Sequence, residues 1–189
     1  MNHASQVSDF GTPVDPTGIS PTEPDWSREA VTKLWDPGRR LLRCIRRYQA
    51  LRGKTGPLTY LRRKYWTAQH MFWSTVTQCE IQLETRIGGG LRLQHPNGII
   101  IHPDAVIGPN CMIFNHVTIG IGKGSKVPVI GGHVDIGAGA RLIGGITVGD
   151  HAIIGLNTVV LRDVPAHGVA VGVPARIIRI GRNAPRSEV

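Results

Sequence analysis

Histidines are the side chains of this sequence best suited to acid–base chemistry, and six of the eight lie beyond residue 94. An imidazole titrates near neutral pH, so a histidine held in position can accept a proton from a substrate and return it later. A carboxylate that orients the ring makes such a base effective. Four of the histidines belong to no evident histidine–carboxylate pair, and we expect them at turns or on the surface: His102, His133, His151 and His167.

A second chemical feature is the glycine- and lysine-bearing segment GIGKGSKVPV, residues 120–129. Its GxGxG pattern is weak evidence for phosphate binding, because the strand–loop–helix context of a nucleotide fold is missing. An insertion of this kind between structural repeats usually projects from one face and often lines a site. We therefore expect a projecting loop here.

The three cysteines, Cys44, Cys79 and Cys111, are not spaced as metal ligands, and their odd number argues against a disulfide framework. We expect reduced thiols, a cytoplasmic protein and no metal site. The net charge of +9 calls for an anionic partner or a solvated basic face, and much of the excess lies in segment 39–64. No recognition helix or base-stacking aromatic platform is visible, so we expect no nucleic-acid partner.

The elements that must position this chemistry follow from an aliphatic residue that returns every sixth position. A period of six fits neither an amphipathic helix nor a simple strand, but it fits short flat strands joined by tight corners, three per coil. The sequence therefore predicts a mainly β protein built as a parallel β-helix of hexapeptide repeats. The anchor residues are Ile101, Ile107, Ile113, Ile119, Ile130, Ile136, Leu142, Val148, Ile154 and Val160.

The rest of the chain divides around this solenoid. We expect a flexible leader over residues 1–25, an α-helical region over 26–78, the hexapeptide β-helix over 79–180 and a tail over 181–189. Asp36-Pro37-Gly38 should divide the helical region, and residues 58–76 should form a further helix whose aromatic residues pack on the solenoid. No apolar run approaches the length of a membrane helix, and the leader lacks the features of a signal peptide.

Four motifs resemble the serine acetyltransferase family, in particular its short members often linked to exopolysaccharide operons. They are EIQLETRIGGGLRLQHPNGIII (80–101), HVTIGIGKG (116–124), IGAGARLIGGITVGDHAIIG (136–155) and DVPAHGVAVGVPARII (163–178). The resemblance covers roughly the last hundred residues. It implies a left-handed β-helix and an acetyl-CoA-dependent O-acetyltransferase, nominally acting on L-serine.

The resemblance also implies roles for individual residues on the acceptor side. His95 occupies the catalytic position of the family, and Glu80 stands where the family has an aspartate that orients the imidazole. Gln94 occupies an acceptor-binding position. His116 is a second candidate, facing the acceptor or acting as the base in place of His95.

On the acetyl-CoA side, the resemblance implies that the cofactor lies in a groove between two subunits. Gly120 would stabilise the oxyanion through its backbone N–H group. The small residues Ala138 and Gly139 would line the groove, and Leu156 replaces an alanine usual there. The remaining candidates, Lys123, Lys126 and Arg141, would contact the cofactor phosphates.

The sequence also departs from the family where the amino acid would be held. Gln94 replaces an aspartate, Lys126-Val127-Pro128 replaces Arg-His-Pro, and Asp36-Pro37 bears only a faint likeness to an acceptor-binding Asp-Pro. These departures favour a second acceptor class, a sugar or exopolysaccharide. A non-catalytic trimeric scaffold is a further alternative. Acyl-CoA sites between prisms imply a homotrimer, or a dimer of trimers if the helices pair.

Overall fold

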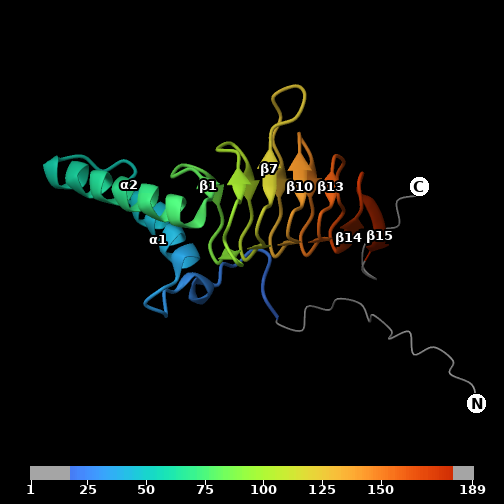
Figure 1. Ribbon diagram of the computed structural model, residues 1–189, viewed down its shortest axis with the longest axis horizontal. Coiled ribbons are helices and arrows are strands. Elements are labelled where there is room, and N and C mark those ends of the chain that lie inside the picture. Colours follow the sequence, from blue (N-terminus) through green and yellow to red (C-terminus); the bar gives the residue numbers. More distant parts are fainter. Residues whose placement is uncertain (1–17, 181–189) are drawn as a thin grey trace, which may run out of the picture.

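The computed structural model describes residues 18–180, which form an elongated molecule with two helices at one end of a β-helix (Figure 1). Three parallel sheets make the faces of a prism, with strand orders β1-β4-β7-β10-β13, β11-β8-β5-β2 and β15-β14-β12-β9-β6-β3. The strands are β1 (Glu80–Ile81), β2 (Arg86–Ile87), β3 (Arg92–Leu93), β4 (Ile100–Ile101), β5 (Val106–Ile107), β6 (Met112–Ile113), β7 (Thr118–Gly120), β8 (Val129–Ile130), β9 (Asp135–Ile136), β10 (Arg141–Ile143), β11 (Thr147–Val148), β12 (Ile153–Ile154), β13 (Val159–Val160), β14 (Gly168–Val171) and β15 (Arg176–Ile180).

The six-residue period accounts for the core of this prism. All ten anchor residues are buried, and the residue before each anchor in a two-residue strand is exposed or half-buried. Anchors of successive coils pair directly, as Ile101 does with Ile119 in the parallel register of β4 and β7. The predicted mainly β, hexapeptide-repeat β-helix is therefore confirmed.

The predicted helical region contains a 3₁₀ turn, η1 (Trp26–Glu29), and the helices α1 (Pro37–Gln49) and α2 (Pro57–Thr77). The predicted break at Asp36-Pro37 is confirmed, since Asp36 caps α1 and Pro37 occupies its first turn. Leu41, Leu42 and Ile45 of α1 are buried.

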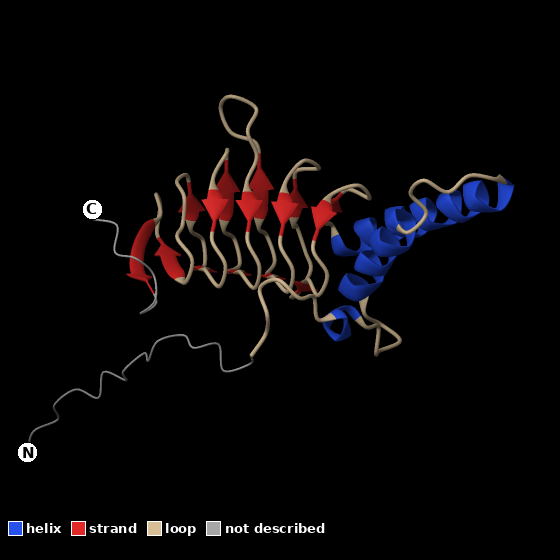
Figure 2. Ribbon diagram, turned by 180° about the vertical axis from the view of Figure 1, so that it is seen from behind, coloured by secondary structure: helices blue, strands red, loops and turns tan. Residues whose placement is uncertain are grey.

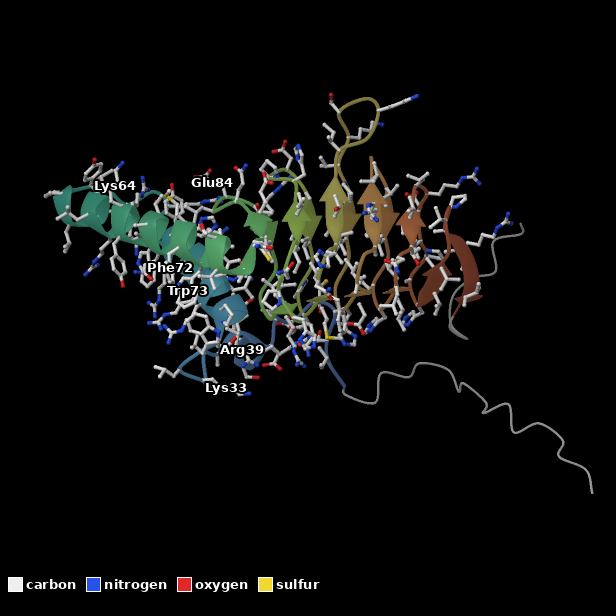
Figure 3. The ribbon with its side chains drawn as sticks, in the orientation of Figure 1. Lys33, Arg39, Lys64, Phe72, Trp73 and Glu84 are labelled. Carbon is white, nitrogen blue, oxygen red and sulfur yellow. The ribbon has the colours of Figure 1, made fainter. Side chains whose placement is uncertain are left out.

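The prediction that the aromatic residues of α2 pack on the prism is largely wrong. Trp73 is buried, with its ring edge-on to Trp35 at 5.7 Å between centroids. The other large side chains of α2 are partly or mostly exposed: Leu61, Tyr65, Trp66, Met71 and Phe72. The reason is geometric, because α2 runs outward past the end of the prism and packs on α1, so that one face of α2 stays uncovered (Figures 1 and 3). Trp66 is the exception besides Trp73, since it is partly buried against the core.

Side chains of α1, of the turn that follows it and of α2 close the open end of the prism. The first coil has no coil below it, so a row of its carbonyl groups lacks strand partners. Arg46 donates to Ile87 O and Gly88 O, both at 2.6 Å. Three further side chains complete this set: Gln49 donates to Leu83 O and Thr85 O, Arg52 to Glu84 O, and His70 to Ile81 O.

The segment before η1 also lies against the prism. Asn110 accepts a hydrogen bond from Asp25 N at 2.8 Å and donates to Ser20 O and Glu23 O, both at 2.7 Å. Residues 18–25 therefore differ from the predicted flexible leader, because the buried Asn110 forms hydrogen bonds with their backbone. The predicted leader over 1–17 and tail over 181–189 lie outside the described residues. At the other end, β14 and β15 pair antiparallel.

Candidate active site

The prism has three edges, each a column of corners. The His95 edge joins the six-stranded to the five-stranded sheet through residues 94–99, 114–117, 137–140 and 155–158. The corner that carries His95 is two residues longer than the others in its column, so the six-residue spacing is interrupted between β3 and β4. His95 has a positive φ of 51° and is exposed. The longer corner thus carries its imidazole outward from the stack.

A pocket of about 380 Å³ opens beside His95. One wall is the segment 92–96, and the other is the end of the η1–α1 linker with the first turn of α1. The two walls meet closely at Gly38, where a Cβ atom would lie 3.1 Å from Pro96 Cγ. The pocket brings Asp36 to the same cavity as Gln94 and His95, which the weak Asp-Pro likeness in the sequence only hinted at.

The structure places Glu80 and His116 near this edge in different ways. Glu80 begins β1, is exposed, and its backbone N–H donates to Ile99 O at 2.8 Å. Within residues 18–180 no hydrogen bond joins the Glu80 carboxylate to His95. His116 occupies the next corner of the column, donates its backbone N–H to Asn97 O at 2.8 Å, and lies over Gly98, where a Cβ would meet its ring.

The candidate groove residues follow the same edge. Backbone N–H groups climb from coil to coil, from His116 to Asn97 O, from Gly139 to Asn115 O and from Asn157 to Ala138 O. Each step is about 4.8 Å, the spacing of neighbouring strands. Ala138 and Gly139 therefore stand one coil beyond His116, and Leu156 one coil further with 70% of its surface exposed. Arg141 begins β10 beside this column and is exposed.

The remaining candidates lie at another edge. The loop between β7 and β8 projects from the corner that joins the five-stranded to the four-stranded sheet (Figure 2). The loop carries Lys123 and Lys126, which are exposed, and it starts at Gly120. The methylene groups of Lys126 cover Gly145. One chain therefore does not bring these three residues together with His95.

The third edge, between the four-stranded and six-stranded sheets, holds three of the histidines expected at turns. His133, His151 and His167 have φ values of 52°, 58° and 58°, which confirms that expectation. Nδ1 of His133 lies 3.0 Å from Nδ1 of His151, and the rings of His151 and His167 stack at 4.7 Å. The fourth, His102, accepts from Asp104 N in a turn. None of the four lines the pocket beside His95.

No group of three or more histidine, cysteine or acidic side chains within residues 18–180 could hold a metal ion. The same part of the chain has no helix with both the length and the apolar character needed to cross a membrane.

The three cysteines are free and buried. Burial raises the pKa of Cys44 to about 11 and that of Cys111 to about 12, and it also raises the pKa of Cys79. Only the thiolate attacks alkylating reagents, so a raised pKa keeps these thiols unreactive. At pH 8, iodoacetamide should label the native protein very slowly and the urea-unfolded protein at all three positions, as mass spectrometry would show. Rapid labelling of a native cysteine would contradict this.

Known proteins resemble this chain in sequence and in fold. No family model matches the chain. A serine acetyltransferase from Helicobacter pylori (strain J99) is 37% identical over 147 residues, which cover 75% of this chain and 81% of that protein. The chain belongs to the serine acetyltransferase family. The serine acetyltransferase of Escherichia coli (strain K12) is 44% identical over 108 residues, or 56% of this chain and 40% of that protein.

Solved structures of serine acetyltransferases have a similar fold. The Brucella abortus enzyme in complex with coenzyme A is 32% identical with a TM-score of 0.65, over 77% of this chain and 57% of that one. The soybean enzyme complexed with serine is 36% identical with a TM-score of 0.64, over 75% and 57%. The chain spans less than half the length of several curated serine acetyltransferases, for example 43% of the Synechococcus elongatus protein. The family resemblance seen in the motifs is confirmed.

Proposed function

We propose that this chain is an acetyl-CoA-dependent O-acetyltransferase of the serine O-acetyltransferase type. The observation that carries the proposal is a single prism edge. On this edge the exposed His95 lies beside a two-walled pocket, and a column of small residues follows in the next coils. Relatives whose structures hold coenzyme A or serine support both substrates. L-serine is the acceptor that the family favours. A sugar or exopolysaccharide is the second candidate, because neutral Gln94 stands in the pocket.

In the proposed reaction, acetyl-CoA supplies the acetyl group as a thioester. His95 takes the proton of the acceptor hydroxyl as its oxygen forms a bond to the carbonyl carbon, and returns the proton to the departing thiolate as the C–S bond breaks. Gly120 of a second copy of the chain would donate its N–H group to the oxyanion, because Gly120 and His95 lie at different edges of one prism. Glu80 would orient the imidazole once substrates are bound, since catalytic hydrogen bonds are often long without them.

The acetyl-CoA site fits the residues present. Ala138 and Gly139 leave room at the corner for a narrow pantetheine arm, and Arg141 offers a charge beside the same column. Lys123 and Lys126 lie at a different edge, so a second copy of the chain would have to bring them to the His95 edge. We therefore propose a homotrimer, with a dimer of trimers as the larger alternative. The three free thiols support a cytoplasmic setting.

Release of free thiol from acetyl-CoA tests the proposal. We expect saturable release with L-serine or with a member of a panel of sugars and nucleotide-sugars. The buried cysteines of the protein should add little background to a thiol reagent. The scaffold alternative predicts neither acetyl-CoA binding by calorimetry nor thiol release with any acceptor, and that result would overturn the proposal.

A further inference from the structure

The pocket beside His95 is strongly basic. Four cationic side chains line it: Arg28, Lys33, Arg39 and Arg92. Lys33 precedes α1 and Arg39 lies in its first turn (Figure 3). Among the described residues, Asp36 is the one carboxylate in the lining, and its Oδ2 is already paired with Arg39 Nη1 at 3.0 Å. The lining therefore carries a net positive charge, because one carboxylate faces four cationic side chains.

Arg28 carries unused hydrogen-bonding capacity in this pocket. Its Nε and Nη1 atoms are buried and have no hydrogen-bond partner within residues 18–180. Burial and then the neighbouring Arg92 lower the pKa of Arg28, while Asp135 and Asp25 act in the opposite direction. Two like charges side by side, with buried N–H groups left over, are unfavourable without a ligand. A guanidinium carries five N–H donors in a plane, an arrangement that suits the oxygens of a carboxylate or phosphate.

The same pocket offers little to an ammonium group. Gln94 is neutral and cannot balance a positive charge, and the carboxylate of Asp36 already serves Arg39 and the first turn of α1. The amino terminus of α1 adds a further positive partial charge to this wall. The ammonium group of an amino acid would thus be repelled by the cations of the pocket. A compound that carries only negative charge would meet no such repulsion.

We propose that the acceptor is a hydroxyl compound that carries a carboxylate or phosphate and no ammonium group, with Arg28 and Arg92 binding the anion while the hydroxyl reaches His95. This inference rests on the proposed acetyl transfer and narrows its acceptor class. The pocket, about 380 Å³, falls in the usual range of small-molecule sites, about 300–1,000 Å³.

Matched acceptors test the inference. Glucose, glucuronate and glucose 6-phosphate share one ring and differ in the charged group. Glycerate differs from L-serine in carrying a hydroxyl group in place of the ammonium group. We expect kcat/KM to be about 10- to 100-fold higher for an anionic member than for its neutral or zwitterionic partner. This is the fold-change that hydrogen bonds to a charged group typically give. The comparison of glucuronate with glucose 6-phosphate separates carboxylate from phosphate.

Two variants test the residues. Arg28→Gln and Arg92→Gln should each raise KM for the anionic acceptor about 10-fold or more, with kcat and the KM for acetyl-CoA little changed. Arg28→Lys keeps the charge without the fork and should give an intermediate KM. Arg86→Gln is the matched control, because Arg86 lies on β2 outside the pocket and donates to Asp104 O. Thermal unfolding of each variant checks that the fold is retained.

The possible outcomes separate failure of this inference from failure of the proposed acetyl transfer. Equal or faster turnover of L-serine or glucose, or an anion preference that survives both glutamine variants, overturns the inference and leaves acetyl transfer intact. If acetyl-CoA binds but no acceptor is turned over, calorimetry with glucuronate and glucose 6-phosphate decides: binding tighter than glucose and lost in Arg28→Gln supports the inference, and equal binding overturns it. Absence of acetyl-CoA binding refutes the proposed function itself.

Discussion

Replacing His95 with alanine is expected to lower kcat by at least about 10²-fold while the affinity for acetyl-CoA barely changes. A general base contributes typically about 10²–10⁴-fold, and a 10²-fold loss corresponds to about 2.7 kcal/mol of transition-state stabilisation. The affinity should hold because the groove residues Ala138 and Gly139 lie more than one coil away from the substituted corner.

The kinetic test pairs steady-state turnover with calorimetric binding of acetyl-CoA. His102→Ala is the control, since His102 lies in a turn outside the pocket and should keep normal turnover. Near-normal kcat in the His95 variant would refute the assignment of the base and transfer the role to His116. Glu80→Gln should give a smaller loss than His95→Ala, because it removes a charge that acts on the base and leaves the base in place.

Replacing Arg46 with alanine should destabilise the fold by about 3–5 kcal/mol, the cost of breaking a buried ion pair from one side. Arg46 pairs with both carboxylate oxygens of Glu29 at 2.8 and 3.0 Å, and the exposed fractions of the two side chains are only 18% and 9%. Its loss would also leave two first-coil carbonyl groups, those of Ile87 and Gly88, without partners.

Urea unfolding followed by circular dichroism would measure this effect. Arg47→Ala is the neighbouring control, because Arg47 is exposed and should change the unfolding free energy by no more than about 0.5 kcal/mol. Equal unfolding free energies for the Arg46 and Arg47 variants would show that the Arg46 guanidinium does not stabilise the first coil. Arg46→Lys should recover part of the loss, since it restores the charge without the fork that grips Glu29.

Much of the prism was predictable because its information is local. An aliphatic anchor every sixth residue specifies strand, corner and buried face together, so the coils of residues 101–164 follow directly from the sequence. His133 and His151 are 18 residues apart, the length of three hexapeptides, so both occupy the same corner position. Each corner recurs one coil later at a fixed phase.

The pocket could not be predicted from local pattern, because its walls are far apart in the chain. Arg28 and Asp36 meet His95 only after α1 docks on the first coil, and no period in the sequence reports that contact. The exposure of α2 was missed for a related reason. Aromatic residues at helical spacing indicate an apolar face, but not whether another surface of the same chain covers it.

The closed first coil has a consequence for how copies of this molecule can meet. A column of parallel coils has no inherent limit, since a bare end coil offers the same hydrogen-bonding template as any coil inside the stack. Here Arg46, Gln49, Arg52 and His70 already occupy the carbonyl groups of that end. Another molecule would find these carbonyl groups already bonded and would meet positive charge besides. Arg46 and Arg52 thus work against head-to-tail stacking of one β-helix on another, because the template for a further coil is already used.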